Sequence, residues 1–214
     1  VCSSDLLYRA NGFRDVKVTT KVAGNHDGKA EEVGVSLTIE EGPQWFVSAV
    51  EISGVNLRDF DNLKALLQTA EGQPYSDTAL VTDRDTILNF YFDSGYPDAT
   101  LELKTEPDEA AHRMGVKIEV TEGRRNFVRR VLVSGYRTTR PRLIYDCIPL
   151  QTGDPLSQSA IIDAQRRLYD LGIFAKVDIA LQNPTGKERD KNVLYRLEEA
   201  SRYSYTFGFG AQLA

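Results

Sequence analysis

The feature that most constrains this chain is an internal repeat, in which a long stretch of sequence returns later in recognisable form. The segment QWFVSAVEISG, which ends at Gly54, returns as RNFVRRVLVSG, which ends at Gly135. The same offset relates two further pairs of segments: Glu41-Gly42 with Glu122-Gly123, and residues 72–76 with residues 153–157. Each copy of such a repeat is one supersecondary unit, so we expect a tandem array rather than a single large domain.

A third landmark, glycine followed by a bulky apolar residue, occurs as Gly12-Phe13, Gly95-Tyr96 and Gly172-Ile173. The step from Gly95 to Gly172 is four positions shorter than the step from Gly54 to Gly135. Four positions are about one turn of an α-helix, and losing one turn preserves an apolar helix face. We therefore expect the second helix of the last copy to be one turn shorter than its counterpart.

Local patterns within the middle copy predict the order of its elements. Residues 46–52 are β-branched and apolar, which predicts a strand ending at Gly54. Leu63, Leu66 and Leu67 have helical spacing, and a second helix is predicted from Ser76-Asp77 to Gly95. Two alternating strands follow, with apolar residues at 99, 101 and 103 and at 114, 116, 118 and 120, and with a polar turn at 106–109. The predicted fold class is α+β: β-α-α-β-β modules with two helices on one face of a three-stranded mixed sheet.

The copies differ in completeness. Residues 7–42 hold only the end of a second helix and two closing strands, whereas residues 43–123 and 124–200 are full units. A unit without its first strand and helix cannot close its core, so we expect the natural protein to extend further N-terminally. Residues 1–6 resemble the read-through translation of a sequencing-library adapter, and a native strand or helix start is the alternative.

A unit of this order and length, with a glycine–aromatic turn and a Glu-Gly strand end, resembles the POTRA domain. The matching segments are FYFDSGY at residues 90–96, LYDLGIF at residues 168–174, and the strand ends ISG and VSG. Tandem POTRA domains followed by a barrel strand resemble the BamA/TamA family of outer-membrane protein assembly factors, which are β-barrel insertases. The resemblance covers residues 7–214. It implies the periplasmic domain of an outer-membrane protein in the Gram-negative cell envelope.

The segment after residue 200 alternates aromatic with small residues. Tyr203, Tyr205, Phe207 and Phe209 all fall on one face of an extended strand. A soluble edge with four exposed aromatics would favour aggregation, whereas the lipid-facing side of a barrel strand requires such residues. We therefore expect residues 201–214 to begin an outer-membrane β-barrel. The alternatives are a last soluble strand packed on the domain core and a glycine-rich nucleotide loop, which normally precedes a helix.

Residues that could carry chemistry are few and scattered. His26 and His112 fall in predicted turns, without a second His or a Cys at ligand spacing. Cys147 aligns with Leu66 on a predicted buried helix stripe beside Ile144 and Ile148, where a thiol acts as a small hydrophobe. The net charge of −5 argues against a general nucleic-acid binder, and no apolar run is long enough for a transmembrane helix. We predict no enzymatic activity, no catalytic residue, no metal and no cofactor.

The strand edges are the predicted binding surfaces. In the POTRA family, unfolded barrel precursors and partner subunits are thought to pair with the strand that follows the second helix. The resemblance implies candidate edges at residues 16–22, 99–105 and 175–181, with these polypeptide-binding positions: Val16, Val18, Thr20, Ala99, Leu101, Leu103, Val177, Ile179 and Leu181. Pairing through the main chain tolerates many sequences. The alternative is that the edges stay unpaired or pack on a neighbouring module, with Lys17, Lys21 and Lys104 guarding against aggregation.

Positive charge is concentrated between residues 124 and 142. This segment has no carboxylate and seven arginines: Arg124, Arg125, Arg129, Arg130, Arg137, Arg140 and Arg142. One hypothesis is contact with anionic lipid head groups or with an acidic partner lipoprotein. The alternative is a solvated face neutralised by Glu198, Glu199 and their neighbours.

Together these patterns predict a periplasmic receptor and scaffold arm that works by β-strand augmentation. Its expected partners are unfolded outer-membrane protein precursors and accessory periplasmic lipoproteins or an inner-membrane partner. The adjoining barrel, through which the protein would contact the outer membrane, would receive and insert the precursors. One alternative is the arm of a two-partner secretion transporter, which exports one dedicated polypeptide and usually has two POTRA domains. A second is a cell-division POTRA protein with a single module.

Overall fold

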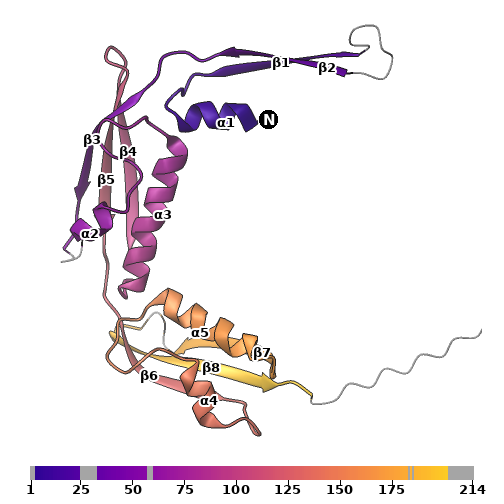
Figure 1. Ribbon diagram of the computed structural model, residues 1–214. Helices are drawn as coiled ribbons and strands as arrows, with labels where there is room; N and C mark the ends of the chain where they lie inside the picture. The colour runs from indigo at the N-terminus through magenta and orange to yellow at the C-terminus, as the bar shows by residue number, and fades with distance from the viewer. Residues whose placement is uncertain (1–2, 25–32, 57–59, 183, 185, 202–214) are drawn as a thin grey trace, which may run out of the picture. The chain divides into compact units, whose positions relative to one another are not determined.

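The computed structural model describes residues 3–24, 33–56, 60–182, 184 and 186–201 (Figure 1). The chain divides into two compact units, one of Val1–Phe90 with Ala99–Glu122 and one of Tyr91–Asp98 with Gly123–Ala214. Tyr203, Tyr205, Phe207 and Phe209 lie outside the described residues, and so does the barrel start predicted there. No helix in the described ranges is long and apolar enough to cross a membrane.

The first unit begins with α1 (Ser3–Ala10), followed by an antiparallel pair of strands, β1 (Lys17–Gly24) and β2 (Val33–Glu40). The helix includes Ser3–Leu6, and Asp5 forms an ion pair with Arg9 one turn later, at 2.8 Å. On the hairpin, Val18 lies opposite Ile39 and Val22 opposite Val35. A helix end and two paired strands are the elements expected in residues 7–42.

The same unit contains a complete module. Its elements are β3 (Phe46–Ser53), α2 (Phe60–Lys64), most of α3 (Asp77–Asp93), β4 (Thr100–Asp108) and β5 (Arg113–Thr121). The strand order is β3-β5-β4, with β3 parallel and β4 antiparallel to the central β5. Along β5, Met114, Val116, Ile118 and Val120 are buried while the residues between them are not. Burial at every second residue means that one face of the sheet packs on the core.

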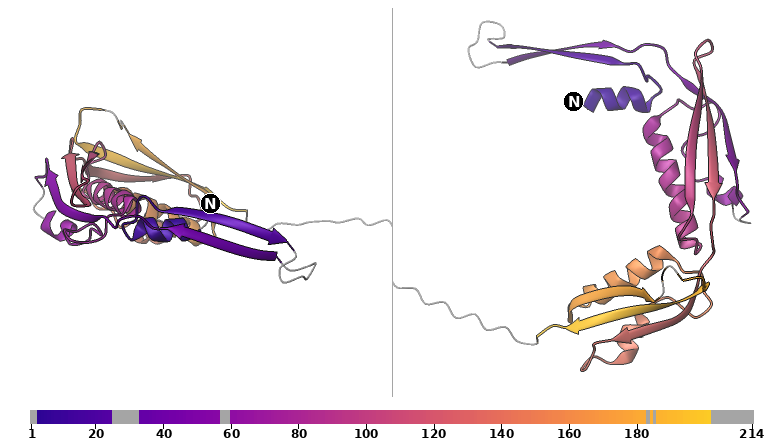
Figure 2. Two further views of the ribbon diagram at one scale, coloured as in Figure 1. Left: turned by 90° about the horizontal axis from the view of Figure 1, so that it is seen from above. Right: turned by 180° about the vertical axis from the view of Figure 1, so that it is seen from behind.

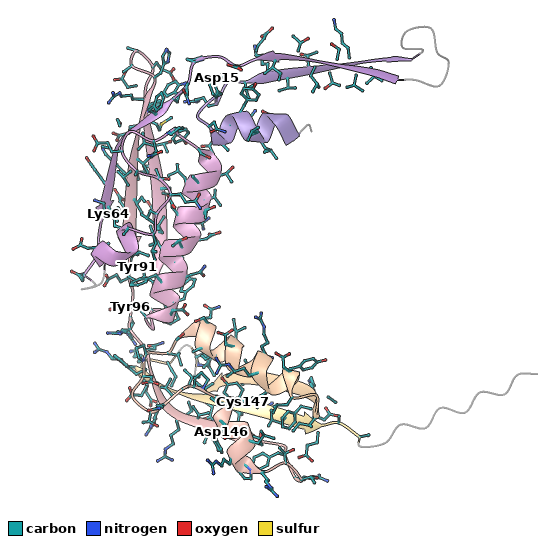
Figure 3. The ribbon with its side chains drawn as sticks, viewed as in Figure 1. Asp15, Lys64, Tyr91, Tyr96, Asp146 and Cys147 are labelled. Carbon is teal, nitrogen blue, oxygen red and sulfur yellow. The ribbon has the colours of Figure 1, made fainter. Side chains whose placement is uncertain are left out.

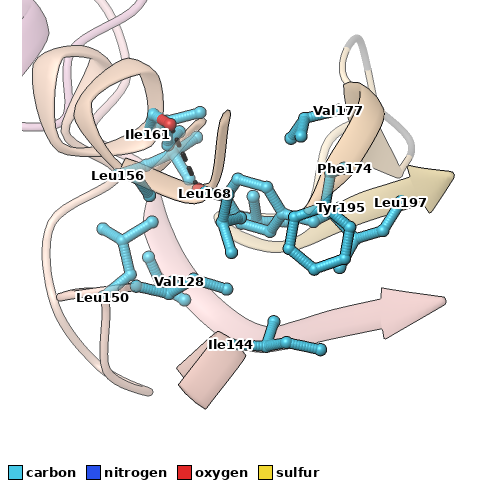
Figure 4. Packing of buried hydrophobic residues seen from close by; sticks show 13 residues of the cluster. Val128, Ile144, Leu150, Leu156, Ile161, Leu168, Phe174, Val177, Tyr195 and Leu197 are labelled. Atoms are coloured by element: carbon cyan, nitrogen blue, oxygen red, sulfur yellow. Dashed lines mark hydrogen bonds between the residues drawn. The ribbon is translucent and has the colours of Figure 1, made fainter. Parts of the chain in front are cut away.

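The second unit repeats this arrangement with β6 (Phe127–Ser134), α4 (Pro141–Asp146), α5 (Gln158–Asp170), β7 (Phe174–Gln182) and β8 (Asp190–Glu199). The order is β6-β8-β7, again with one parallel and one antiparallel pair. Ile144 of α4 and Leu168 of α5 pack on the buried face of β8 (Figure 4). The hydroxyl of Tyr195 donates to the carbonyl oxygen of Ile161 at 3.2 Å, which satisfies a polar group inside this core. The predicted α+β modules with mixed sheets are confirmed.

The expected difference between the two long helices is also confirmed. Helix α3 has 17 residues and α5 has 13, so α5 is four residues shorter. Both helices begin after a serine cap, because Ser76 accepts from the backbone N–H of Ala79 and Ser157 from that of Ala160.

The repeat extends to details of the backbone. The first strand of each module has a bulge, between Val47 and Ala49 in β3 and between Val128 and Arg130 in β6. Each of these strands also forms one isolated bridge to a proline, Phe46 to Pro74 and Phe127 to Pro155. The two modules therefore share their irregularities as well as their elements.

Two predictions about local structure are wrong. Helix α2 ends at Lys64, so Leu63 is buried but Leu66 is 67% exposed. The chain turns after Lys64, with the backbone N–H of Leu66 bonded to the carbonyl of Leu63, so the apolar stripe does not continue. The polar turn predicted at 106–109 also begins too early, because β4 runs through Pro107 to Asp108. An edge strand tolerates proline, since a missing N–H on the open side costs no ladder bond.

Cys147 differs from its predicted place on a buried helix stripe. It lies directly after α4, next to Asp146 (Figure 3), and is only half-buried beside the buried Ile144 and Ile148. Burial raises the pKa of its thiol, which disfavours the reactive thiolate.

Candidate functional site

The strand that follows the second helix lies at an edge of each three-stranded sheet. These edges are β4 in the first unit and β7 in the second, because β5 and β8 occupy the centres. An edge strand has one row of backbone N–H and C=O groups that its own sheet does not use. The described residues therefore present open edges where two of the predicted strands lie.

The side chains of the nine predicted positions mostly face the interior. Val16, Ala99 and Val177 are buried, and Val16 and Ala99 come just before β1 and β4 rather than within them. Thr20 is exposed, whereas the remaining five are half-buried: Val18, Leu101, Leu103, Ile179 and Leu181. These strands can therefore offer a partner their backbone, while most of the named side chains hold the module together.

The solvent-facing side of the β4 edge is charged. The amine of Lys104 lies 2.8 Å from a carboxylate oxygen of Glu119, and the amine of Lys117 lies 2.7 Å from Glu106. These hydrogen bonds raise the pKa of both lysines. Such cross-strand pairs stabilise the β4–β5 ladder on a face where apolar groups would favour aggregation.

The β7 edge is different, because a groove opens beside it. Helix α5 lies alongside β7, as the right view of Figure 2 shows. Between them is a groove of about 390 Å³, lined on the helix by Ile162, Gln165, Arg166 and Tyr169 and on the strand by Ala175, Lys176 and Val177. Ile162 is 46% exposed and Tyr169 59% exposed, so the groove offers apolar surface next to the outer backbone edge of β7.

The helical half of this groove was not predicted from the sequence. Ile162, Gln165, Arg166 and Tyr169 have the i, i+3, i+4, i+7 spacing of one helix face. The spacing was available from the sequence. It did not show that this face flanks an open edge instead of lying in the core.

The arginines between residues 124 and 142 do not act as one group. Arg124 donates to the carbonyl of Lys187, and Arg125 donates to the carbonyl of Ser94 while its guanidinium lies over the rings of Tyr96 and Phe127. Arg129 approaches Glu188 at 3.9 Å, and Arg142 approaches Asp146 at 3.8 Å. Arg130, Arg137 and Arg140 are exposed. The first two arginines therefore have structural roles, and the lipid or acidic-partner hypothesis applies to the remaining ones.

Glu199 has a role that differs from charge neutralisation. Its carboxylate accepts hydrogen bonds from the backbone N–H groups of Arg137, Thr138 and Thr139 and from the hydroxyl of Thr139. These bonds, led by the one from the Thr139 backbone, lower the pKa of Glu199 to about 2. Glu199 also lines a second hollow, of about 670 Å³, with Arg140, Leu143 and Ile173 among its neighbours.

Potential metal ligands among the described residues are scattered. In the part of the chain that the structure describes, no group of three or more His, Cys, Asp or Glu side chains could hold a metal ion. His112 lies in an exposed turn, with its ring 5.6 Å from that of Trp45, and His26 lies outside the described residues.

Comparison with known proteins identifies the repeat. The family model of POTRA, described as the surface antigen variable number repeat, matches residues 46–123 and 127–200. The chain belongs to the POTRA family. Its two matched POTRA domains correspond to the two complete β-α-α-β-β modules.

Several relatives of this chain are named as outer membrane protein assembly factors. The chain is 23% identical over 205 residues to the assembly factor BamA of Nitratidesulfovibrio vulgaris, covering 94% of this chain and 25% of that protein. Among solved structures, BamA from Haemophilus ducreyi lacking POTRA domains 1–3 matches with 25% identity and a TM-score of 0.63 over 73% of this chain and 30% of that one. POTRA domains 3–5 of Haemophilus influenzae BamA match in fold, at 21% identity and a TM-score of 0.58, over 91% and 76%.

The chain spans about a quarter of the length of the curated relatives that it matches. It is a BamA-like POTRA region, located in the Gram-negative cell envelope as a periplasmic domain of an outer-membrane protein.

Proposed function

We propose that this chain is the periplasmic receptor arm of an outer membrane protein assembly factor, and that it binds unfolded barrel precursors by adding them as a strand to β7. The observation that carries the proposal is the open edge of β7 with an apolar groove beside it. Edge backbone groups would supply sequence-tolerant hydrogen bonds, and the groove would receive alternate side chains of the added strand. Accessory subunits could use the same mode on β4 or β1, and the barrel predicted after residue 200 would receive the precursor.

The family and the names of the relatives support this assignment. Proteins named as outer membrane protein assembly factors match nearly the whole chain, and BamA structures share its fold. Within the chain, β7 is favoured over β4 because exposed Ile162 and Tyr169 line a groove beside β7.

Strand addition can be tested with peptides of about ten residues, the length of a barrel strand, that alternate aromatic with small polar residues. Two isomers are compared, one N-methylated at the aromatic residues and one at the polar residues. The alternating side chains fix which backbone groups face the sheet, so strand addition predicts that one isomer binds and the other does not. Amide NMR shifts should be centred on β7. Equal binding of both isomers, or shifts centred elsewhere, would contradict the proposal.

A further inference from the structure

One side chain already occupies the edge of β7. The amide nitrogen of Gln165, on α5, donates a hydrogen bond to the backbone carbonyl oxygen of Val177 at 2.6 Å. Gln165 is half-buried and belongs to the lining of the groove between α5 and β7. The bond occupies a backbone acceptor that a strand added beside β7 would otherwise use.

The register shows that this carbonyl points away from the sheet. The backbone N–H of Ala200 bonds to the carbonyl of Ile173, so Ile173 is a residue whose carbonyl faces β8. Along an antiparallel pair, residues whose backbone groups face the partner strand alternate with residues whose backbone groups face away from it. At the bulge between Phe174 and Lys176, two residues of β7 lie opposite one residue of β8, so they count as one position in this alternation. The alternation makes Val177, opposite Leu197, a residue whose N–H and C=O groups face the open edge.

Gln165 therefore takes an acceptor that an added strand would need. We infer that Gln165 is a gate on the β7 edge: its amide imitates the first N–H of an incoming strand, and it must leave Val177 before an extended polypeptide can pair there. The inference rests on the proposed function, because it concerns access to the same edge. When only a fraction of the molecules is in the binding-competent state, the apparent dissociation constant is the intrinsic one divided by that fraction, so binding is weaker.

The groove gives the released side chain a place to go. Its volume of about 390 Å³ borders Gln165 directly, and the flanking Ile162, Arg166 and Tyr169 leave it open to solvent. When the amide of Gln165 leaves the carbonyl of Val177, it can form a hydrogen bond to water or to a polar group of the incoming peptide. Breaking the contact therefore costs little free energy. The contact is therefore suited to a gate that a correctly placed strand can displace.

The middle POTRA domain provides an internal contrast. Helices α3 and α5 end at Asp93 and Asp170, and when these two ends are aligned, Gln165 corresponds to Leu88. Leucine has no donor, so Leu88 cannot close the β4 edge in the same way. The gate is a property of the last POTRA domain and not of the repeat.

The test compares Gln165→Leu with Gln158→Leu, the same substitution at an exposed position on the same helix. The alternating peptide of the preceding test is titrated against wild type and both variants. Loss of a competing hydrogen bond should tighten binding of Gln165→Leu by about two- to tenfold, and Gln158→Leu should bind as wild type does. Thermal unfolding is measured in parallel to detect any loss of stability.

The outcomes separate the gate from the proposed function. If wild type binds the peptide at β7 but Gln165→Leu binds it equally or more weakly, the gate is wrong while strand addition stands. A lower melting temperature for Gln165→Leu without tighter binding would show that Gln165 only fastens α5 to β7. If neither protein binds the peptide at β7, strand addition at this edge fails and the gate fails with it.

Discussion

The carboxylate of Glu199 lies 2.8 Å from the hydroxyl oxygen of Thr139, 60 residues earlier in the chain. The same carboxylate accepts the backbone N–H groups of Arg137, Thr138 and Thr139, so it closes the loop between β6 and α4. The middle POTRA domain has a related contact, in which Glu122 accepts from the backbone N–H of Asn56. A glutamate at or directly after the end of the last strand therefore contacts the loop after the first strand in both domains.

We expect the contact of Glu199 to make stability depend on acid pH. Hydrogen bonds lower its pKa from 4.5 to about 2, so between these values the unfolded chain binds more protons than the folded one. The stabilisation is complete above pH 4.5 and is lost as the pH falls towards 2. Urea unfolding of Glu199→Gln should therefore show a weaker pH dependence across this range than wild type. Glu198→Gln, next in the strand and exposed, is the matched control and should retain the wild-type dependence.

We expect the carboxylate of Asp83 to be important for the stability of the first unit. Its side chain is 1% exposed, and its two oxygens accept from the backbone N–H groups of Gln68 and Thr69 at 2.7 and 2.8 Å. In Asp83→Asn an amide NH₂ faces one of these donors, which should lower the free energy of unfolding by about 1–3 kcal/mol. Denaturant unfolding measures the change. Asp85→Asn, exposed on the same helix, should stay within about 0.5 kcal/mol of wild type; an equal loss in both variants would contradict the assignment.

Two glycines with similar backbone angles should respond differently to alanine. Gly135 and Gly153 have φ angles of 90° and 93°, so a side chain at either costs about 1–2 kcal/mol of backbone strain. At Gly135 a Cβ atom would also overlap the carbonyl oxygen of Leu197, whereas at Gly153 it would meet no atom within 4 Å. Overpacking adds about 1–3 kcal/mol, so Gly135→Ala should lose clearly more stability than Gly153→Ala in chemical denaturation. Equal losses of stability in the two variants would show that the cost of alanine comes from the backbone angle alone.

The arginine hypothesis makes a prediction about lipid surfaces. Arg130, Arg137 and Arg140 are exposed, and an arginine near an anionic surface contributes on the order of 1 kcal/mol. Replacing all three with glutamine should weaken sedimentation of the chain with anionic vesicles, and added salt should weaken that of wild type. Arg84 and Arg113, exposed in the first unit, provide a control double replacement. If binding to vesicles does not change with salt, with lipid charge or with any of these replacements, the hypothesis that these arginines contact anionic lipid is wrong.

Prediction from the sequence worked best where a pattern is local. The missing helical turn of α5 followed from a change in repeat length, and the start of α3 after Ser76 followed from residue type. It failed at Leu66, because helical spacing does not show where a helix ends. The binding role predicted for Val177, Ile179 and Leu181 stays a prediction, and the structure adds that these side chains are buried or half-buried while their strand lies at a sheet edge.

The sequence by itself determined the repeat, the order of the elements and the POTRA fold, because apolar periodicity and glycine positions are encoded residue by residue. Only the tertiary structure decided that α5 flanks the β7 edge, that Gln165 reaches Val177 and that Glu199 closes a loop 60 residues away. These contacts depend on the strand order β6-β8-β7, which brings together segments distant in the chain. A hydrogen bond requires atoms within about 3 Å of each other, and sequence spacing does not specify that distance across a fold.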